Sequence, residues 1–510
     1  MTETQFNLID DPWIPALTLD SDDVQEYNII EILTRAHEMH SITHSYTPYV
    51  FSLLRFLGVI LTDMYQPSSI FELADLLGEG HFDPERITAY FDHERQYFNL
   101  FGNDDARPFL QVPINELTER TLNKKTRPIA KLFYTIPSAS NKFFFQRHFD
   151  DEYAICPAEC ARLLVSYLPF SMTGGRSYQP GPNNAPPIYT FLQGASLFET
   201  LCYTMIVEKP RENVGTQDIG WREPIPDTDT KWDELSTLFG LTVMPRNIRL
   251  FPEEEGGICS VTGKPSDILI REMYFLGGTH QFDKKRLFFR DPFCTYTVGR
   301  TKLKPLYKKS GQGFWSYIAA HTFLTQETFP KVKIERPLIV NQFYQLLQEY
   351  HPQKLRVCAV YLETTQAKIF VQEVLDTEIP IDAMTQTLQT QTIQHALEIT
   401  EFAEKQLRYA IRNFSPSKNR GRMETAYRNC QARFWQDLEV PFFEKIVFPM
   451  IETSEEKNTC IQEWVQTCIT TGEQIFHNYF RHLMHGKHLK QKVRELITFK
   501  EKIETKFLGT

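Results

Sequence analysis

Residues 393–414 read Ile-Gln-His-Ala-Leu-Glu-Ile-Thr-Glu-Phe-Ala-Glu-Lys-Gln-Leu-Arg-Tyr-Ala-Ile-Arg-Asn-Phe, and this stretch decides the fold of the C-terminal region. Apolar side chains recur at intervals of three or four residues or their sums, which is the spacing of one helix face. The positions in this and three later segments are Ile393, Leu397, Thr400, Leu407, Ile411 and Phe414; Met423, Tyr427, Cys430 and Phe434; Ile461, Val465, Cys468, Phe476 and Leu483; and Leu489, Val493, Leu496, Ile503 and Phe507. Breaks near Ser415-Pro416, Pro449 and Gly486 separate the segments, so we predict a four-helix bundle over residues 381–510.

The first 380 residues show a mixed pattern. Residues 49–64 and 70–77 have the apolar character of two helices, which we expect to pack together, and residues 355–361 alternate like a strand. A chain of 510 residues also exceeds what one hydrophobic core usually organises. The predicted fold class is therefore α+β: a large mixed α/β N-terminal domain, residues 1–380, followed by the C-terminal four-helix bundle, residues 381–510.

Composition sets limits on location and partners. The nine cysteines are scattered, the N-terminus lacks the form of a signal peptide, and no apolar run approaches about 18 residues. We therefore expect a cytoplasmic protein without a membrane span. The net charge of -9 argues against coating nucleic acid through bulk electrostatics. Local basic clusters nevertheless suit phosphate contacts, although each is also compatible with a solvated face. The residues that we predict to contact phosphates are Lys124, Lys125, Lys418, Arg420 and Arg422.

Residues 138–176 hold the most unusual sequence. Phe143, Phe144 and Phe145 are consecutive, so their side chains cannot share one face of a strand or helix. One interpretation is a strand buried on both faces. The other is a loop that presents an aromatic wedge beside polar side chains, which is the mixture that minor-groove binders use. Gly174 and Gly175 would allow close backbone approach to a ligand, and a plain turn explains them equally well.

Motifs for catalysis are missing from the sequence. It contains no complete phosphate-binding loop, no Gly-x-Ser-x-Gly elbow and no Gly-x-Gly-x-x-Gly fingerprint. His37 and His40 lack the spacing of a His-Glu-x-x-His zinc motif. We therefore expect no catalytic residue, no cofactor and no metal. The alternative is a metal-dependent nucleic-acid-processing enzyme with a dispersed active site, and a third possibility is a purely structural scaffold.

Short motifs in a matching order carry a family resemblance. The opening Asn7-Leu-Ile-Asp-Asp-Pro-Trp-Ile-Pro15 is similar to that of CasA, the large-subunit family of the type I-E CRISPR Cascade complex. Residues 141–147 resemble the family's loop with Asn followed by Phe, residues 173–176 its glycine-rich loop, and Thr190 to Gly194 its Thr-Phe-x-x-Gly segment. Total length and a helical C-terminus agree as well, so the resemblance spans the whole chain.

The resemblance implies a non-catalytic DNA-recognition subunit. Such a subunit would recognise the protospacer-adjacent motif in duplex DNA, aid duplex opening and R-loop formation, and dock the Cas nuclease-helicase. Its other partners would be the crRNA-containing subunits, namely the backbone, small-subunit and crRNA 5′-end-binding proteins. Gln366 matches the family's strand-separating wedge, with one residue inserted after Tyr361. The residues predicted to read the motif are Asn141, Phe144, Phe145, Gln146, Thr173, Gly174, Gly175 and Arg176.

The resemblance also raises the question of zinc, because family members can carry two cysteine pairs suited to that metal. Here Cys156 and Cys160 are spaced by three residues, and Thr262 stands where the partner of Cys259 would be wanted. Three thiolates fall short of the four ligands of a structural zinc site. We therefore expect a metal-free remnant held by packing.

Overall fold

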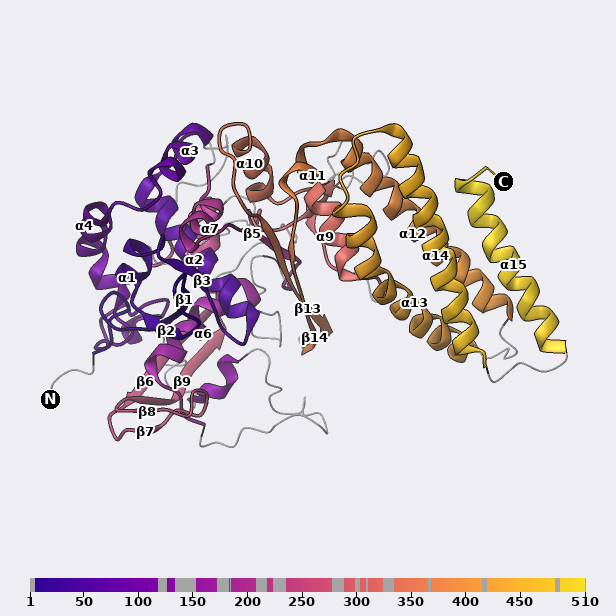
Figure 1. The fold of residues 1–510 in the computed structure, drawn as a ribbon. Coiled ribbons are helices and arrows are strands. Elements are labelled where there is room, and N and C mark those ends of the chain that lie inside the picture. Colours follow the sequence, from indigo (N-terminus) through magenta and orange to yellow (C-terminus); the bar gives the residue numbers. More distant parts are fainter. Residues whose placement is uncertain are drawn as a thin grey trace. The chain divides into compact units, whose positions relative to one another are not determined.

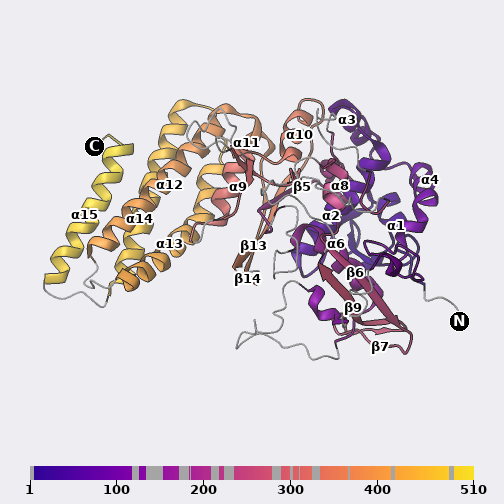
Figure 2. The same cartoon turned by 180° about the vertical axis from the view of Figure 1, so that it is seen from behind.

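The computed structural model describes two compact units (Figures 1 and 2). The mixed unit comprises Met1–Leu306, Pro337–Gln353 and Cys358–Val374, and the helical unit comprises Tyr307–Arg336, Lys354–Val357 and Leu375–Thr510. Within them the structure describes residues 5–117, 126–133, 153–171, 183, 185–207, 218–222, 235–277, 289–298, 303–308, 311–323, 334–365, 368–414, 420–481 and 487–509. The fold class is α+β, as predicted.

A long buried helix, α2 (Thr47–Tyr65), organises the mixed unit (Figure 1). It packs against α6 (Pro157–Phe170) and α7 (Leu197–Thr204), and Gly58 allows the close approach, because a Cβ there would lie 2.5 Å from Thr204 Oγ1. We expected no apolar run of this length, but this helix is long and apolar enough to cross a membrane by length and composition. However, 83% of its apolar window is buried inside the protein. α2 is therefore the core helix of the unit.

The second predicted helix is α3 (Ile70–Glu79), which packs on α7 and on α10 (Leu338–Leu346). The expected packing between the two predicted helices is therefore not the main contact of α3. The remaining helices of the mixed unit are short: α1 (Ile29–Thr34), α4 (Pro84–Glu94), η1 (Arg95–Phe98), η2 (Ile114–Glu116), η3 (Ile129–Leu132) and α8 (Thr237–Thr242).

The mixed unit also contains small sheets. β1 (Ile14–Thr18) lies between β2 (Val24–Tyr27) and β3 (Met39–Ile42), and Trp13, directly before β1, is fully buried with its Nε1 donating to Leu8 O at 3.1 Å. The other strands are β6 (Arg246–Glu253) and β4 (Arg127–Pro128) on either side of β9 (Leu269–Gly277); β7 (Gly257–Ile258) with β8 (Pro265–Ser266); β10 (Tyr296–Val298) with β11 (Leu303–Pro305); and β13 (Arg356–Thr365) between β5 (Tyr189–Gln193) and β14 (Lys368–Glu378).

The helical unit contains the four long helices that the sequence predicts (Figure 2). These are α12 (Thr387–Phe414), α13 (Arg420–Phe442), α14 (Ser454–Tyr479) and α15 (Lys487–Phe507). α12 packs against the other three, and the Trp464 indole on α14 donates to Ala396 O on α12 at 2.9 Å. A π-helix, η6 (Phe443–Val447), continues α13, and α11 (Ile381–Thr385) precedes α12.

One further segment belongs to the helical unit although the sequence pattern assigned it to the N-terminal domain. Residues 307–336, with α9 (Phe314–Phe323) and β12 (Ile334–Glu335), join it. The reason is aromatic packing: Trp315 Nε1 donates to Trp435 O at 2.8 Å, and the Trp315 ring lies 4.5 Å from that of Phe442. The unit therefore differs in extent from the predicted range 381–510.

α15 turns a different face to the bundle from the one its apolar spacing indicates. Ile503 is fully buried as predicted, whereas Leu489 and Val493 are exposed. The side chains that face inward in their place are Lys492 and Glu495. The prediction for Leu489 and Val493 was therefore wrong, because polar partners on α12 and α14 receive the inward residues.

Candidate nucleic-acid interface

Most residues predicted to contact DNA lie outside the described residues. These are Asn141, Phe144, Phe145, Gln146, Thr173, Gly174, Gly175, Arg176, Gln366, Lys124, Lys125 and Lys418. Arg420 and Arg422 belong to the first turns of α13, of which the backbone alone is described there. Their roles remain predictions. The structure describes the residues that flank the predicted segments along the chain.

The two described residues that flank segment 134–152, which holds the aromatic motif, contact one another. Phe133 and Tyr153 flank it, and their rings pack edge to face with centroids 5.5 Å apart. Tyr153 leads directly into α6, in which every residue is buried. The described residues on either side of this segment are therefore held together by a packed aromatic pair.

The segment 172–182, which holds the glycine motif, has its own anchor. The Tyr189 hydroxyl on β5 donates to Pro169 O at 2.7 Å, close before the segment, and also bonds the Asn183 side chain directly after it. Burial raises the pKa of Tyr189 well above its ordinary value, so the hydroxyl remains a donor. α6 therefore lies along the chain between the two motif segments, and its length is about 20 Å by the rise per residue of a helix.

α6 itself is held by a buried arginine. Arg162 Nε donates to Trp13 O at 2.7 Å, and its guanidinium also pairs with Glu159 and Glu26. Burial raises the pKa of Glu159, although the adjacent guanidinium opposes that shift. The N-terminal motif around Trp13 is thus structurally tied to the helix between the two predicted DNA-reading segments.

Gln366 lies between two paired strands. β13 ends at Thr365 and β14 begins at Lys368, so Gln366 and Ala367 form the connection between them. The strand expected at residues 355–361 is therefore longer than its apolar pattern, and Arg356 pairs across it with Asp376 at 2.8 Å. Gln366 therefore follows the last residue of β13 along the chain, and its role as the strand-separating wedge stays a prediction.

The cysteines raised by the zinc question do come close together. The Cys156 N–H donates to Cys259 Sγ at 3.4 Å, and both lie near the start of α6, where Cys160 is fully buried. A hydrogen bond from the Cys156 side chain, aided by Thr262, lowers the pKa of Cys259 to about 4 against the effect of burial. The same bond raises the pKa of Cys156. Two cysteines in contact, with the Thr262 hydroxyl beside Cys259, fall short of the four ligands of a structural zinc site.

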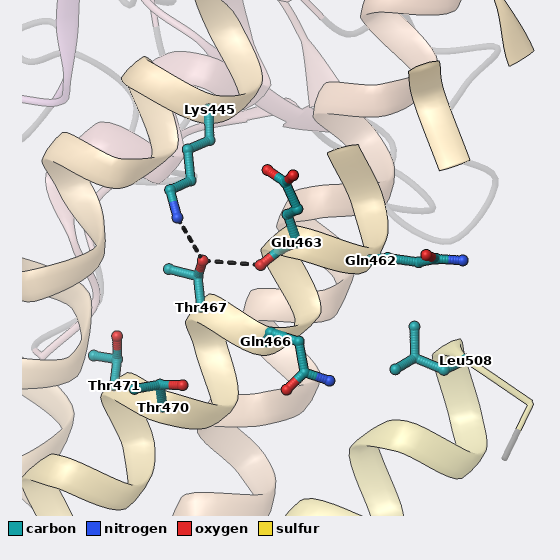
Figure 3. A pocket seen from close by; sticks show the side chains of 8 residues that line it. All are labelled: Lys445, Gln462, Glu463, Gln466, Thr467, Thr470, Thr471 and Leu508. Atoms are coloured by element: carbon teal, nitrogen blue, oxygen red, sulfur yellow. Dashed lines mark hydrogen bonds between the residues drawn. The ribbon is translucent and has the colours of Figure 1, made fainter. Parts of the chain in front are cut away.

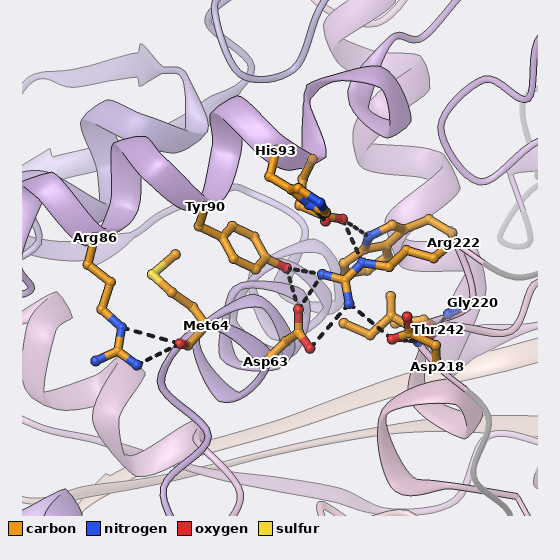
Figure 4. Close-up of polar contacts among 12 residues, drawn as sticks. Asp63, Met64, Arg86, Tyr90, His93, Asp218, Gly220, Arg222 and Thr242 are labelled. Atoms are coloured by element: carbon orange, nitrogen blue, oxygen red, sulfur yellow. Dashed lines mark hydrogen bonds and ion pairs between the residues drawn. The ribbon is translucent and has the colours of Figure 1, made fainter.

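An ionic cluster in the mixed unit bears on the enzyme alternative (Figure 4). Arg222 lies between three carboxylates, with Nη2 2.5 Å from Asp63, Nε 2.7 Å from Glu94 and Nη1 3.0 Å from Asp218. Burial lowers the pKa of Arg222, but the bonds with Glu94 and Asp63 outweigh this effect and raise it overall. The three carboxylates are therefore already paired with a cation of the protein itself. Across the part of the chain that the structure describes, no group of three or more His, Cys, Asp and Glu side chains could hold a metal ion.

A polar groove of about 790 Å³ lies in the helical unit (Figure 3). Its residues come from η6, α14 and the end of α15: Lys445, Gln462, Glu463, Gln466, Thr467, Thr470, Thr471 and Leu508. Lys445 Nζ donates to Thr467 Oγ1 at 3.1 Å, and that hydroxyl donates to Glu463 O at 2.9 Å. The groove offers hydrogen-bonding amides and hydroxyls without a paired nucleophile and base.

The comparison with family models decides the family. Residues 7–470 match the model of CRISPR-associated protein Cse1. This chain belongs to the Cse1 family.

Relatives of known sequence and structure agree with this assignment. The chain is 29% identical over 266 residues to CRISPR-associated protein CasA/Cse1 of Thermus thermophilus, and the match spans about half of each protein, 49% of this chain and 50% of the relative. Its fold resembles Thermus thermophilus CasA, with a TM-score of 0.74 and 20% identity over 98% of this chain and 100% of the other. It also resembles Thermobifida fusca Cse1, with a TM-score of 0.75 and 18% identity over 99% and 98%. The resemblance inferred from the motifs is thus confirmed.

In this Cse1 chain, sequence reasoning missed the Arg222 cluster. Arg222 is 159 positions from Asp63 and 128 from Glu94, and only Asp218 is near it in the sequence, so no local motif indicates the cluster. A lone apolar pair, Ile219 and Trp221, beside Arg222 was the available signal, since both side chains are buried. The cluster anchors residues 218–222 to the helices α2 and α4.

Proposed function

We propose that this chain is the non-catalytic large subunit of a CRISPR Cascade surveillance complex. In this role it recognises the protospacer-adjacent motif in duplex DNA, aids duplex opening and R-loop formation, and docks the Cas nuclease-helicase. The observation that carries the proposal is the Cse1 family match over residues 7–470. A chain from a structure titled "CRISPR RNA-guided surveillance complex" has the same fold, with a TM-score of 0.74 and 17% identity over 97% of this chain and 99% of the other.

The physical logic of guided recognition supports this division of labour. When base pairing with a guide RNA reads the long target sequence, protein needs to read only a short duplex motif and hold the displaced strands. Minor-groove readout is degenerate, so amide and backbone donors around Asn141 and Gly175 would give a loose motif preference. The contacts Phe133–Tyr153 and Tyr189–Pro169 support this role, because they hold the described residues that flank segments 134–152 and 172–182.

The central experiment measures binding of the assembled complex to duplexes with a randomised flanking motif, with and without this subunit. Motif preference should disappear without the subunit. Gly175→Leu should weaken binding to the preferred motif, because a side chain there would block close backbone approach. Gly78→Leu is the matched control, since a Cβ at Gly78 meets nothing within 4 Å on the exposed side of α3. Unchanged motif preference in Gly175→Leu would count against the assignment of the site.

The enzyme alternative predicts divalent-metal-dependent nuclease activity of the isolated chain. The Arg222 cluster gives that alternative no support, because its three carboxylates are already paired with a guanidinium. Cleavage of DNA or RNA by the purified chain, abolished by chelation and by Asp63→Asn, would establish the enzyme and refute the non-catalytic role.

A further inference from the structure

The first half of α15 carries an apolar row on its exposed side. Leu489, Val493 and Ile497 are 42%, 47% and 50% exposed. They are four residues apart, so they lie along one side of the helix. Among the exposed large apolar side chains of the described residues, these three form a row on a single helix. In Figures 1 and 2, α15 lies at the outer side of the helical unit.

The opposite side of the same half-helix is polar and buried. Lys492 is 2% exposed and Glu495 5% exposed. Lys492 Nζ lies 3.0 Å from His477 Nδ1 on α14, and Asn413 Nδ2 on α12 donates to Glu495 Oε2 at 3.1 Å. Burying charged groups is costly even when they are paired. If hydrophobic burial alone set the rotation of this helix about its axis, the apolar row would face the bundle. Polar contacts set the observed rotation instead, and they leave the apolar row exposed.

The inversion is confined to the first half of the helix. Towards the C-terminus, Phe499 and Ile503 are 2% and 0% exposed and face the bundle in the ordinary way. The exposed row is therefore not a general feature of a loosely packed helix. It marks a defined length of about two turns, from residue 489 to residue 497.

Charge beside the row indicates the kind of partner. Lys490 and Arg494 are exposed next to it, and the single acidic residue between positions 487 and 500, Glu495, is buried. Arg494 keeps a 74% exposed side chain even though its Nη2 lies 3.1 Å from Glu495. Pairing this face with its own copy would bring like charges together, which is destabilising. An acidic partner would not carry that cost.

We propose that Leu489, Val493 and Ile497, with Lys490 and Arg494 beside them, dock an amphipathic helix of a partner protein whose apolar stripe is flanked by Asp or Glu. An apolar row of this spacing suits a partner helix that packs its own apolar side chains against the row and into the gaps between its members. Flanking charges of opposite sign set its orientation. Resting on the proposed function, the partner is another protein subunit of the surveillance complex.

The first experiment tests the surface with a defined probe and the full chain. A stapled helical peptide with Leu at every fourth position and Glu on both flanks is titrated by fluorescence anisotropy. Val493→Asp/Ile497→Asp should weaken its binding about tenfold or more, since both the apolar contact and the charge match are lost. Val440→Asp, on the 62% exposed Val440 of α13, is the matched control and should bind like the unaltered chain. Equal binding by all three proteins would overturn the surface.

A charge exchange tests the chemistry of the flanks. Lys490→Glu/Arg494→Glu should bind the Glu-flanked peptide more weakly and a Lys-flanked version of it more tightly. Thermal unfolding is measured alongside, because Arg494 also lies 3.1 Å from the buried Glu495, and Lys490→Glu alone, at an exposed residue, repeats the test without disturbing that contact. If the apolar variant binds as before while the charge exchange reduces binding of single-stranded DNA, the face is a phosphate contact and the proposal fails. If the chain dimerises and Val493→Asp/Ile497→Asp abolishes the dimer, a second copy is the occupant and the proposal fails.

The second experiment separates this inference from the proposed function. The chain is co-expressed with the other subunits and crRNA, and its incorporation is measured by native mass spectrometry. Incorporation of the unaltered chain and of Val440→Asp, with loss for Val493→Asp/Ile497→Asp, supports both proposals. Equal incorporation of every variant overturns the docking surface and leaves the function intact. Absence of the unaltered chain from the complex, with specific peptide binding retained, refutes the proposed function and the identity of the partner while the surface stands.

Discussion

At the scale of single residues, the buried pair Arg55–Asp291 shows how costly an unpaired charge would be. Arg55 Nη2 lies 2.8 Å from Asp291 Oδ2, with side chains 5% and 1% exposed, and Nη1 donates to Leu241 O at 2.8 Å. Arg55→Met leaves the carboxylate buried without its partner, so we expect a loss of about 3–5 kcal/mol in the free energy of unfolding. Denaturant titration measures it.

Two controls test that explanation. Arg55→Met/Asp291→Asn removes both charges and keeps an oxygen that can accept from Phe293 N, so it should recover part of the loss. Arg35→Met breaks the exposed pair Arg35–Glu38, 46% and 50% exposed, and should cost much less than the loss of the buried partner, because solvent screens an exposed pair. Equal losses for the buried and exposed pairs would contradict the role of burial.

Gln366 also belongs to the residue scale, because the proposed role rests on one side chain. An amide inserted beside the first separating base pair would offset part of an unstacking cost of a few kcal/mol. Gln366→Ala should therefore slow R-loop formation on fully paired targets and have much less effect on targets whose motif-proximal bases are already mismatched. Stopped-flow measurement of strand opening compares the two substrates. Equal defects on both would argue for a simple contact or a folding defect.

Thr365→Ala is the comparison for register. Thr365 is the last residue of β13, directly before Gln366. The chain carries one residue more than the family pattern between Tyr361 and Gln366. A larger defect selective for paired DNA in Thr365→Ala would move the wedge by one position.

At the scale of elements, α14 begins with a capping box that can be tested on its own. Thr453 Oγ1 accepts from Glu456 N at 3.2 Å, and Glu456 Oε2 accepts from Thr453 N at 3.0 Å. Thr453→Ala should lower the free energy of unfolding by about 1 kcal/mol, because an N-cap acceptor is lost. Thr459→Ala, inside the same helix, is the control and should show no such loss, since alanine favours a helix interior.

The capping box also predicts a pH dependence. Backbone hydrogen bonds from Glu452 and Thr453 lower the pKa of Glu456 below its ordinary value of 4.5. Its contribution to stability is therefore complete above pH 4.5 and is lost as the pH falls through the lower folded-state pKa. Glu456→Gln should be less stable than the unaltered chain at pH 7, and the difference should shrink in acid. A difference that stays constant down to pH 3 would contradict this linkage.

Helical periodicity predicted the helical unit well where the inward side of the helix is mainly apolar. Ile393, Leu407 and Ile411 on α12 are all buried, as their spacing indicates. The same reasoning failed on α15, where Lys492 and Glu495 find polar partners across the bundle. Periodicity identifies the apolar side of a helix, but it contains no information about polar groups that other helices present.

At the scale of the whole molecule, motif order identified the family although each motif is short. The sequence did not reveal contacts between residues that are far apart along the chain, such as those of Arg222 with Asp63 and Glu94. The division into units was also hidden, because the packing of Trp315 on Trp435 depends on segments 120 residues apart. Local sequence patterns report local structure, and contacts of this separation follow from the assembled core.

The last prediction concerns the charge of the whole chain. A protein of net charge -9 repels DNA at long range, so binding must rely on local cations. At physiological salt the screening length is about 8 Å, so a cation interacts mainly with phosphates that lie within that distance. Distant charges of the chain then have little effect on that interaction. Neutralising a phosphate-binding residue should therefore reduce the slope of log affinity against log salt by up to about one unit. The residues to test singly in the assembled complex are Lys124, Lys125, Lys418, Arg420 and Arg422.

Arg433→Gln provides the matched control for this series. Arg433 is exposed on α13, but its guanidinium is already paired with Asp437 at 2.8 Å. Its neutralisation should leave the salt slope unchanged, because no counterion-releasing phosphate contact is lost. A slope that also stays unchanged for Arg420→Gln and Arg422→Gln would show that the start of α13 is a solvated face. A reduced slope for those two with an unchanged slope for Arg433→Gln would place DNA phosphates at the start of α13 even though the chain as a whole is acidic.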